Sequence, residues 1–420
     1  MAQTQFDLGA VPRATNSTDF AATRAEGLRR LAAFVPRAGR VYADGRNVDH
    51  GPQLRDNVSV LSPYLRHRLI TEREVVDAVL AQHSPAAAEK FVAEVLWRTY
   101  WKGWLERRPE VWTRFVSGRE MARDNMARTS GLAKAVAVAE AGNTGIAGFD
   151  DWARELAATG YLHNHARMWV ASIWIFTLKL PWELGADFFL RHLIDADPAS
   201  NTLSWRWVAG LQTVGKTYLA TASNIARYTD DRFEPKGLAT SAQPLTEPPV
   251  PKAHTLRHLP VAPLGPVLLL VTAEDLHPES VVPEGQIIAG VTVIHGADHA
   301  GGWPWGDKAA AFVVSAAGDA ATRAAAQWGC QTTVEPLLDA NQLITRARTV
   351  GARAIVTPYA PVGPIADALA CISPQLAAAN VPLVELRRSW DERFWPYATK
   401  GFFAFKERIP DVLAVEGLRG

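Results

Sequence analysis

One eight-residue segment matches a motif for holding phosphate groups. Gly210–Thr217 reads Gly-Leu-Gln-Thr-Val-Gly-Lys-Thr, the pattern in which backbone amides and a lysine bind nucleotide phosphates. That motif requires a buried strand before it and a helix after it. Here it follows Trp205-Arg206-Trp207 in a stretch that reads as helix, and no strand ending in a metal-binding aspartate accompanies it. An ATP-dependent function is therefore the least favoured of three functions that this sequence suggests.

Histidines, cysteines and tryptophans are the other residues that could do chemistry. His163 and His165 are two positions apart, so on a helix they point about 200° away from each other and do not form a chelate. Cys330 and Cys371 are far apart and form no Cys-X-X-Cys motif, and the sequence predicts no metal site. Ten of the 15 tryptophans precede residue 240, an excess of indoles over average usage.

A proline-rich break divides the chain into two predicted domains. Eight prolines lie between Pro235 and Pro266, which indicates a stiff, extended connector. We expect a helical domain at residues 1–235, a linker at 236–262 and an α/β domain at 263–420. Residues 1–240 carry a charge of +4 and residues 241–420 a charge of −3, so if either domain meets a nucleic acid, it is the first.

The hydrophobic periodicity differs between the two domains. Apolar residues recur at three- and four-residue spacing before the linker, and short β-rich runs alternate with alanine-rich helical stretches after it. The predicted helices of the first domain include Ala25–Val35, Glu72–Leu80, Ala86–Leu105 and Asp150–Leu156. The predicted strands of the second are Val267–Thr272, Ile287–Ile294, Gln331–Glu335, Ala354–Thr357 and Val381–Leu386, with helices at Lys308–Trp328, Ala340–Val350 and Ile365–Ala379. The predicted fold class is an all-helical domain followed by a doubly wound parallel α/β domain.

Composition excludes several classes of protein. The 420 residues include 44 Lys plus Arg and 43 Asp plus Glu, which excludes a uniformly basic nucleic-acid coat. The N-terminus has no signal-peptide pattern, and the longest apolar run, Met168–Leu180, is too short to span a membrane. We expect a monomeric protein that stays off membranes and resides in the reducing cytoplasm.

Several blocks of the first domain occur in a characteristic order. They are Leu61–Leu65, Glu94–Arg98, Gly142–Gly145, Thr159–Met168, Trp182, Leu193–Asn201 and Trp205–Trp207. Together they resemble the flavin-binding helical domain of the DNA photolyase and cryptochrome family, over about residues 20–235. Many separate blocks in register are more specific than any single motif.

The resemblance implies flavin adenine dinucleotide (FAD) as the cofactor. Its implied ligands are Tyr42, Ser59, Leu61, Ser62, Arg98, Arg167, Asp195, Asp197 and Asn201. Arg167 and Asp195 match a buried pair beside the isoalloxazine ring. Since a lone buried charge is costly, the presence of each residue supports the assignment of the other to this pair. Ser59 and Ser62 flank a predicted helix start before Pro63, where amides and hydroxyls can bind phosphate oxygens.

The resemblance also implies a substrate, a cyclobutane pyrimidine dimer flipped out of DNA into a pocket. The implied catalytic residues are Glu94, Trp97, Asn164, Met168, Trp207 and, facing the flavin N5, Asn201. Glu94 matches a residue that hydrogen-bonds the dimer, and Trp97 and Trp207 match stacking walls. Asn164 and Met168 favour the cyclobutane dimer over the (6-4) lesion.

Departures from the family pattern concern electron transfer and DNA binding. Trp205 and Trp182 match the first two members of a tryptophan chain that reduces the flavin, but the third position is Ala139. Trp169, Trp174, Trp152 and Trp112 are the candidate replacements. Two positions that commonly hold arginine in the family are His165 and Ala220 here. We therefore expect a low affinity for duplex DNA and a preference for single strands.

The order of the domains implies a circular permutation. Family members carry an α/β domain before the helical one, whereas here Ala347–Leu386 and Trp390–Phe403 resemble later segments of that domain. In relatives it can hold a second, antenna chromophore, a folate or a deazaflavin, and the sequence selects neither. The implied function is light-driven repair of pyrimidine dimers, a deoxyribodipyrimidine photo-lyase activity. The alternative is a cryptochrome-like blue-light photoreceptor without repair activity.

Overall fold

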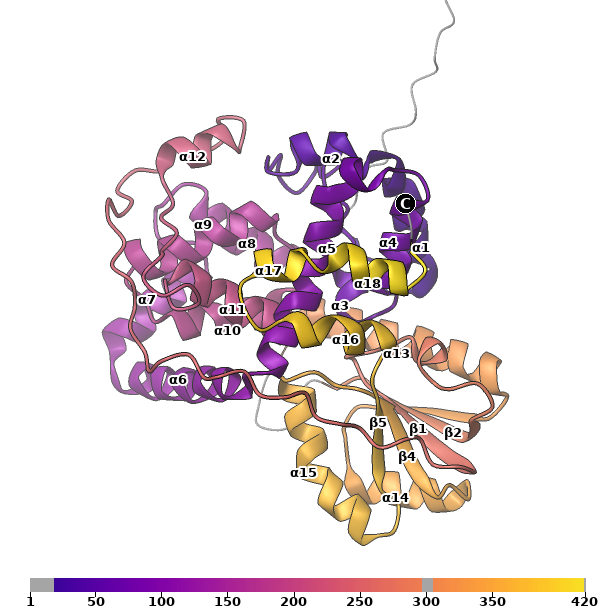
Figure 1. Ribbon diagram of the computed structural model, residues 1–420. Helices are drawn as coiled ribbons and strands as arrows, with labels where there is room; N and C mark the ends of the chain where they lie inside the picture. Colours follow the sequence, from indigo (N-terminus) through magenta and orange to yellow (C-terminus); the bar gives the residue numbers. More distant parts are fainter. Residues whose placement is uncertain (1–18, 297–304, 419–420) are drawn as a thin grey trace, which may run out of the picture.

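The computed structural model describes residues 19–296 and 305–418, so residues 1–18 of the predicted helical domain lie outside it. Helices fill the chain from residue 24 to 227 and a sheet follows (Figure 1). The α-helices of this helical part are α1 (Arg24–Phe34), α2 (Arg40–Gly45), α3 (Ser62–Arg66), α4 (Glu72–Leu80), α5 (Pro85–Glu106), α6 (Pro109–Arg128), α7 (Ser130–Glu140), α8 (Phe149–Thr159), α9 (Asn164–Ser172), α10 (Trp182–His192), α11 (Pro198–Val208) and α12 (Ala222–Arg227). One 3₁₀ turn, η1 (Val35–Arg37), follows α1, and one π-turn, η2 (Ile173–Thr177), follows α9.

Local sequence signals set the limits of the helices. Thr71 and Glu74 form a capping box at the start of α4, because each side chain bonds the other residue's backbone N–H. Ser84 caps α5 and Pro85 occupies its first turn, where a proline removes no helical hydrogen bond. Helix α5 packs against α4, α11 and α2 and is the central helix of the helical part.

The sheet confirms the predicted fold class of a helical part followed by a parallel α/β part. Its strands are β1 (Pro266–Val271), β2 (Ile287–Ile294), β3 (Gln331–Glu335), β4 (Ala354–Pro358) and β5 (Leu383–Leu386), all parallel in the order β3-β2-β1-β4-β5. The connecting helices are α13 (Asp307–Trp328), α14 (Ala340–Thr349) and α15 (Pro364–Ala378), and a 3₁₀ turn, η3 (Pro278–Ser280), follows β1. Strand β1 is buried on both faces, which explains its continuous apolar run.

Beyond β5 the chain leaves the sheet and returns to the helical part. It forms α16 (Ser389–Phe394), η4 (Trp395–Tyr397), α17 (Phe402–Lys406) and α18 (Ile409–Val415), and the first three pack against α5. The Tyr100 hydroxyl of α5 donates to the Lys400 carbonyl at 2.7 Å. The predicted α/β domain of residues 263–420 thus contains a last segment whose packing partner is α5.

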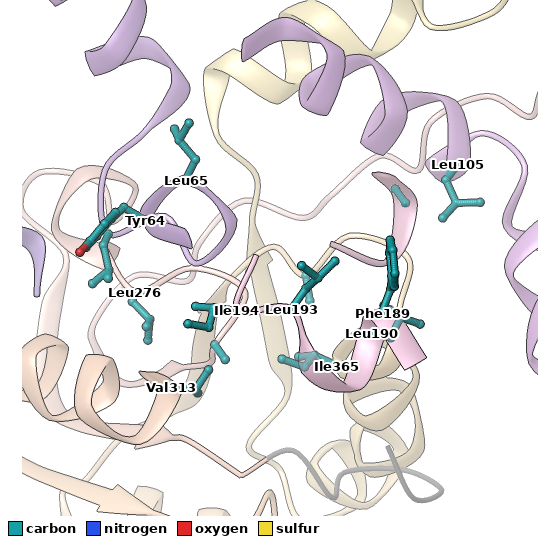
Figure 2. Packing of buried hydrophobic residues seen from close by; sticks show 14 of the residues in the cluster. Tyr64, Leu65, Leu105, Phe189, Leu190, Leu193, Ile194, Leu276, Val313 and Ile365 are labelled. Atoms are coloured by element: carbon teal, nitrogen blue, oxygen red, sulfur yellow. The ribbon is translucent and has the colours of Figure 1, made fainter. Parts of the chain in front are cut away.

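One hydrophobic core runs through both parts of the molecule. Figure 2 shows Leu193 and Ile194, which follow α10, beside Val313 of α13 and Ile365 of α15. Helix α13 also packs against α8 and α10. The two parts therefore share buried apolar surface as well as polar contacts.

The predicted linker is an extended segment bound to the helical part. Arg108 and Arg114 donate to the carbonyls of Pro251 and Pro248, and Arg206 pairs with Glu247. These contacts hold the linker along α6 and α11. Among residues 19–296 and 305–418, none of the helices has the length and apolar character needed to cross a membrane.

Candidate functional site

A cavity of about 430 Å³ lies among α2, α5, α9 and α11. It brings together most of the residues predicted from the sequence: Tyr42, Ser59, Ser62, Glu94, Trp97, Arg98, Asn164, Arg167, Met168, Asp195, Asp197, Asn201, Trp205 and Trp207. Leu61 lies next to this set, fully buried at the start of α3, and does not line the cavity. Trp182 is also outside the lining, at the start of α10.

Helical spacing explains how residues far apart in sequence share one cavity. Glu94, Trp97, Arg98 and Trp101 follow the i, i+3, i+4, i+7 pattern on α5, so they lie on one face. Asn164, Arg167 and Met168 do the same on α9, and Asn201, Ser204 and Trp205 on α11. Each of these inward faces carries polar as well as apolar side chains, which is unusual for a face that borders a core.

The first ion pair of the cavity joins α9 to the loop before α11. The Arg167 guanidinium donates to Asp195 Oδ2 at 2.8 Å and to the Leu162 carbonyl at 3.0 Å. Burial alone would raise the pKa of Asp195, but Arg167, with a smaller contribution from Arg98, holds it below its usual range. Both groups are therefore charged at neutral pH.

The second charged group is Asp197, which caps α11 by accepting from the Ser200 N–H at 2.8 Å. Its other oxygen lies 3.3 Å from Lys102 Nζ and 3.9 Å from Arg98. Burial opposes ionisation, yet Lys102 and Arg98 hold the pKa of Asp197 well below its ordinary value. The sequence interpretation missed Lys102, although its position four residues after Arg98 places it on a neighbouring part of the same helix.

Three buried polar atoms of residues that line this cavity have no hydrogen-bond partner within the described residues. They are Asp195 Oδ1, Arg98 Nη1 and Trp205 Nε1. An unsatisfied buried donor or acceptor costs about 1–3 kcal/mol, so these atoms indicate a bound molecule that offers both donors and acceptors. Two cations, two carboxylates and the Ser59 and Ser62 hydroxyls fit a dinucleotide with a polar ring edge and phosphates, which is the chemistry of FAD.

The predicted substrate residues line the cavity from α5, α9 and α11. Glu94 forms an ion pair with Arg46, a residue that the sequence interpretation missed. Trp207 is 36% exposed and stacks on Tyr218, with ring centroids 5.7 Å apart. One face of Trp97 is covered by Phe402 of α17 at a centroid distance of 3.7 Å, so only the remaining surface of Trp97 borders the cavity.

Trp205 lies in the cavity wall and contacts two aromatic rings. Trp174 is edge-on to it at a centroid distance of 6.3 Å, and Phe189 lies at 5.1 Å. Gly185 permits this packing, because a Cβ there would meet the Trp205 ring at 2.4 Å. Trp182 contacts Phe115 at 5.5 Å, and Trp152 stacks on Trp169 at 5.1 Å. Of the candidate replacement donors, Trp174 is in contact with Trp205.

The two other motifs of the sequence have separate environments. His163 Nε2 faces the Arg46 carbonyl, whereas the His165 ring stacks on Trp169 at 4.2 Å. Gly210–Thr217 is a series of turns that directly follows α11. Because a helix and not a strand precedes it, the segment lacks the structural context of a phosphate loop, and this contradicts the ATP hypothesis.

Part of the chain is similar to known proteins. Residues 91–237 match a family model described as the FAD binding domain of DNA photolyase. A deoxyribodipyrimidine photo-lyase of Streptomyces griseus is 33% identical over 173 residues, which cover 41% of this chain and 35% of that protein. A chloroplastic/mitochondrial cryptochrome DASH of Ostreococcus tauri is 30% identical over 240 residues, covering 55% of this chain and 42% of that protein.

Among solved structures, a bacterial class III photolyase from Agrobacterium tumefaciens is 26% identical with a TM-score of 0.40, covering 50% of this chain and 43% of that one. The chain matches about two fifths of the length of these relatives. The matching region holds α5 to α12, which supply most of the cavity. Residues 91–237 of this chain therefore resemble the FAD binding domain of DNA photolyase.

Proposed function

We propose that this protein binds FAD in the cavity and uses light to repair cyclobutane pyrimidine dimers in DNA. The observation that carries the proposal is the convergence of Arg98, Arg167, Asp195, Asp197 and Asn201 on one buried cavity. The names of the photo-lyase relatives support the same activity. When bound and reduced, FAD would supply the electron that splits the dimer.

Different residues of the chain would bind different parts of the cofactor. The Arg167–Asp195 pair would face the polar edge of the ring, with its unpaired Oδ1 free to accept a hydrogen bond from it. Arg98, Ser59 and Ser62 would bind the phosphate and ribose end. Asn201 is held by donating to the Ala186 carbonyl at 2.9 Å, so its side-chain oxygen has a fixed direction.

Glu94 and Trp207 would act on the substrate. The Glu94 carboxylate would accept hydrogen bonds from the dimer, and Arg46 would hold that carboxylate in place until the substrate arrives. Trp207 offers an exposed indole on which a flipped base can stack, worth about 1–3 kcal/mol per base. Splitting and binding are thus assigned to different side chains.

The test separates these two roles. Glu94→Gln should lower the yield of dimer splitting more than the affinity for a dimer-containing oligonucleotide, whereas Trp207→Ala should weaken binding first. Glu89→Gln, on the same helix but exposed and paired with Lys406, is the matched control and should behave as wild type. Equal losses in all three variants would contradict the assignment.

We further propose a preference for single-stranded or distorted DNA. Flipping a base from a duplex costs a few kcal/mol that phosphate contacts normally offset. His165 and Ala220 stand at two positions where arginine is common, and the Ala220 side chain is buried. The protein should therefore bind a thymine dimer more tightly in a single strand than in a duplex, and this affinity should depend weakly on salt. Equal affinity for the two forms, with a steep salt dependence, would contradict this.

A photoreceptor is the second candidate function, favoured by the cryptochrome relative and by the contact between Trp205 and Trp174. In that case light would reduce the flavin through the indoles without any repair of DNA. Light-driven flavin reduction combined with failure to restore dimers in both single strands and duplexes would select it.

A further inference from the structure

A buried ion network joins the α/β part to the wall of the cavity. The segment Thr272–His277 follows β1 and lies against the helical part, with Glu274 3% exposed. Both Glu274 oxygens accept from the Arg66 guanidinium, at 2.7 and 2.6 Å. Arg66 also donates to the Ala196 carbonyl at 2.7 Å, between the two cavity carboxylates in sequence.

Lys102 connects this network to the cavity. Its Nζ lies 3.3 Å from Asp197 and 4.0 Å from Glu274, and it is fully buried. Lys102 Nζ has no hydrogen-bond partner among the described residues, so the two carboxylates hold it by charge. Asp197 lines the cavity, whereas Glu274 and Lys102 stand behind it.

The neighbouring carboxylate, Asp275, has different partners. Asp275 binds Arg388 through two hydrogen bonds of 2.6 and 2.7 Å and lies 3.4 Å from Arg68. Arg68 also binds Asp391, and Arg388 also donates to the His277 carbonyl. Asp275 thus binds mainly Arg388 of the α/β part and reaches Arg68 of the helical part at 3.4 Å, whereas Glu274 is the member that faces Arg66 and Lys102.

The charges near Asp197 leave a positive balance that depends on Glu274. Arg66, Arg98 and Lys102 all lie close enough to stabilise the ionised form of Asp197. Glu274 is the carboxylate that offsets two of them, Arg66 and Lys102. In a buried site such charges are poorly screened, so one unit of charge changes the local potential strongly.

We propose that Glu274 is a positioning residue, supplied by the α/β part, that holds Lys102 and Arg66 against Asp197 and sets the positive charge beside the bound flavin. The inference rests on the proposed function, namely on FAD in the cavity. Positive charge stabilises the anionic reduced flavin over the neutral oxidised one. The network would thereby tune how readily the cofactor is reduced.

Two substitutions in the same network give opposite predictions. Glu274→Gln removes a negative charge and should raise the flavin reduction potential, whereas Lys102→Gln removes a positive charge and should lower it. We expect each to change the ratio of reduced to oxidised flavin by about tenfold, equivalent to about 30 mV for a two-electron couple. Damage to the fold alone would shift both potentials in the same direction.

The potentials are measured by redox titration of the flavin-loaded full chain, beside thermal unfolding. Glu279→Gln is the matched control, since Glu279 of η3 follows this segment closely but pairs with Arg323. Flavin-bound variants with unshifted or like-signed potentials would overturn the inference. Where Glu274→Gln does not fold, Lys102→Gln decides alone, because an unchanged or raised potential contradicts the proposal. A wild-type chain that takes up no FAD defeats the proposed function instead.

Discussion

Arg167 and Asp195 show how the cavity constrains single residues. Asp195 is 1% exposed in its side chain, and Arg167 is the cation that bonds it directly. Tyr161 packs under this pair and lies between two guanidinium groups, with Arg167 at 5.5 Å and Arg55 at 4.9 Å from its ring. The pair is therefore fixed on several sides.

Arg167→Ala should destabilise the protein by about 3–5 kcal/mol, because it leaves the Asp195 carboxylate buried without its partner. Chemical denaturation of the flavin-free protein measures this, and flavin content should fall as well. Arg154→Ala is the control: its pair with Asp151 is exposed and should contribute less than about 1 kcal/mol. Similar losses in the two variants would contradict the role given to Asp195.

Trp205→Phe should stop light-driven flavin reduction while leaving flavin binding unchanged. Trp174→Phe should slow it, because Trp174 contacts the Trp205 ring. Transient absorption after a light flash follows both. Trp328→Phe, at the end of α13, is the control and should reduce the flavin at the wild-type rate. Undiminished reduction in Trp205→Phe would refute the route.

The resemblance to the photolyase and cryptochrome family identified many of the residues that line the cavity, because its motifs can be recognised locally along the chain. It missed Arg46, Lys102 and Glu274, whose roles depend on partners distant in sequence. Arg46 meets Glu94 across 48 residues, and Glu274 meets Arg66 across 208. No spacing rule encodes such contacts; they follow only from how the two parts pack.

At the scale of elements, apolar periodicity and β-rich runs predicted the helices and strands well. Glu72–Leu80, Ile287–Ile294 and Gln331–Glu335 have the limits expected from their patterns, since a capping box or a change of periodicity marks each end. The π-turn Ile173–Thr177 carries no such local signal. The return of α16, η4 and α17 onto α5 was also absent from the sequence interpretation, because an amphipathic pattern does not identify the surface that will cover the apolar face.

Helix α9 gives a prediction at this scale. His163 caps it, since Nδ1 accepts from the His165 N–H at 3.2 Å, and burial lowers the pKa of His163 to about 4. Unfolded histidine titrates near 6.5, so the unfolded chain binds the proton first as pH falls. The stabilisation is complete above pH 6.5 and is lost as pH falls through 4, by roughly 3 kcal/mol.

His163→Asn keeps a capping side chain but removes the titration. The free energy of unfolding of this variant should therefore fall less steeply than wild type between pH 6.5 and 4. Denaturant titrations at a series of pH values compare the two slopes. Parallel slopes would show that His163 does not titrate in this range.

At the scale of the whole molecule, the segment of residues 389–418 supports the cavity. Phe402 of α17 stacks on Trp97, and the ring of Trp395 lies against Gly103, where an added Cβ would meet it at 2.7 Å. Helix α18 lies beside α4, where Arg73 binds Glu416 (Figure 1). The circular permutation stays a prediction, as do the domain limits at residues 235 and 263.

Phe402→Ala should cost about 3–5 kcal/mol, because it empties the space against Trp97. Phe403→Ala, one residue later, removes a ring that is 81% exposed and should be nearly neutral. Thermal unfolding and flavin affinity of the two variants test this. Equal stability would mean that α17 does not support the cavity.

The most direct test of the account is repair itself. Purified protein, loaded with FAD and reduced, is illuminated with an oligonucleotide that contains one thymine dimer, beside a dark sample and Glu94→Gln. We predict that intact thymines are restored in the light only, and that Glu94→Gln restores far fewer. Stoichiometric FAD with no repair in the light, in single strands or duplexes, would contradict the proposed function.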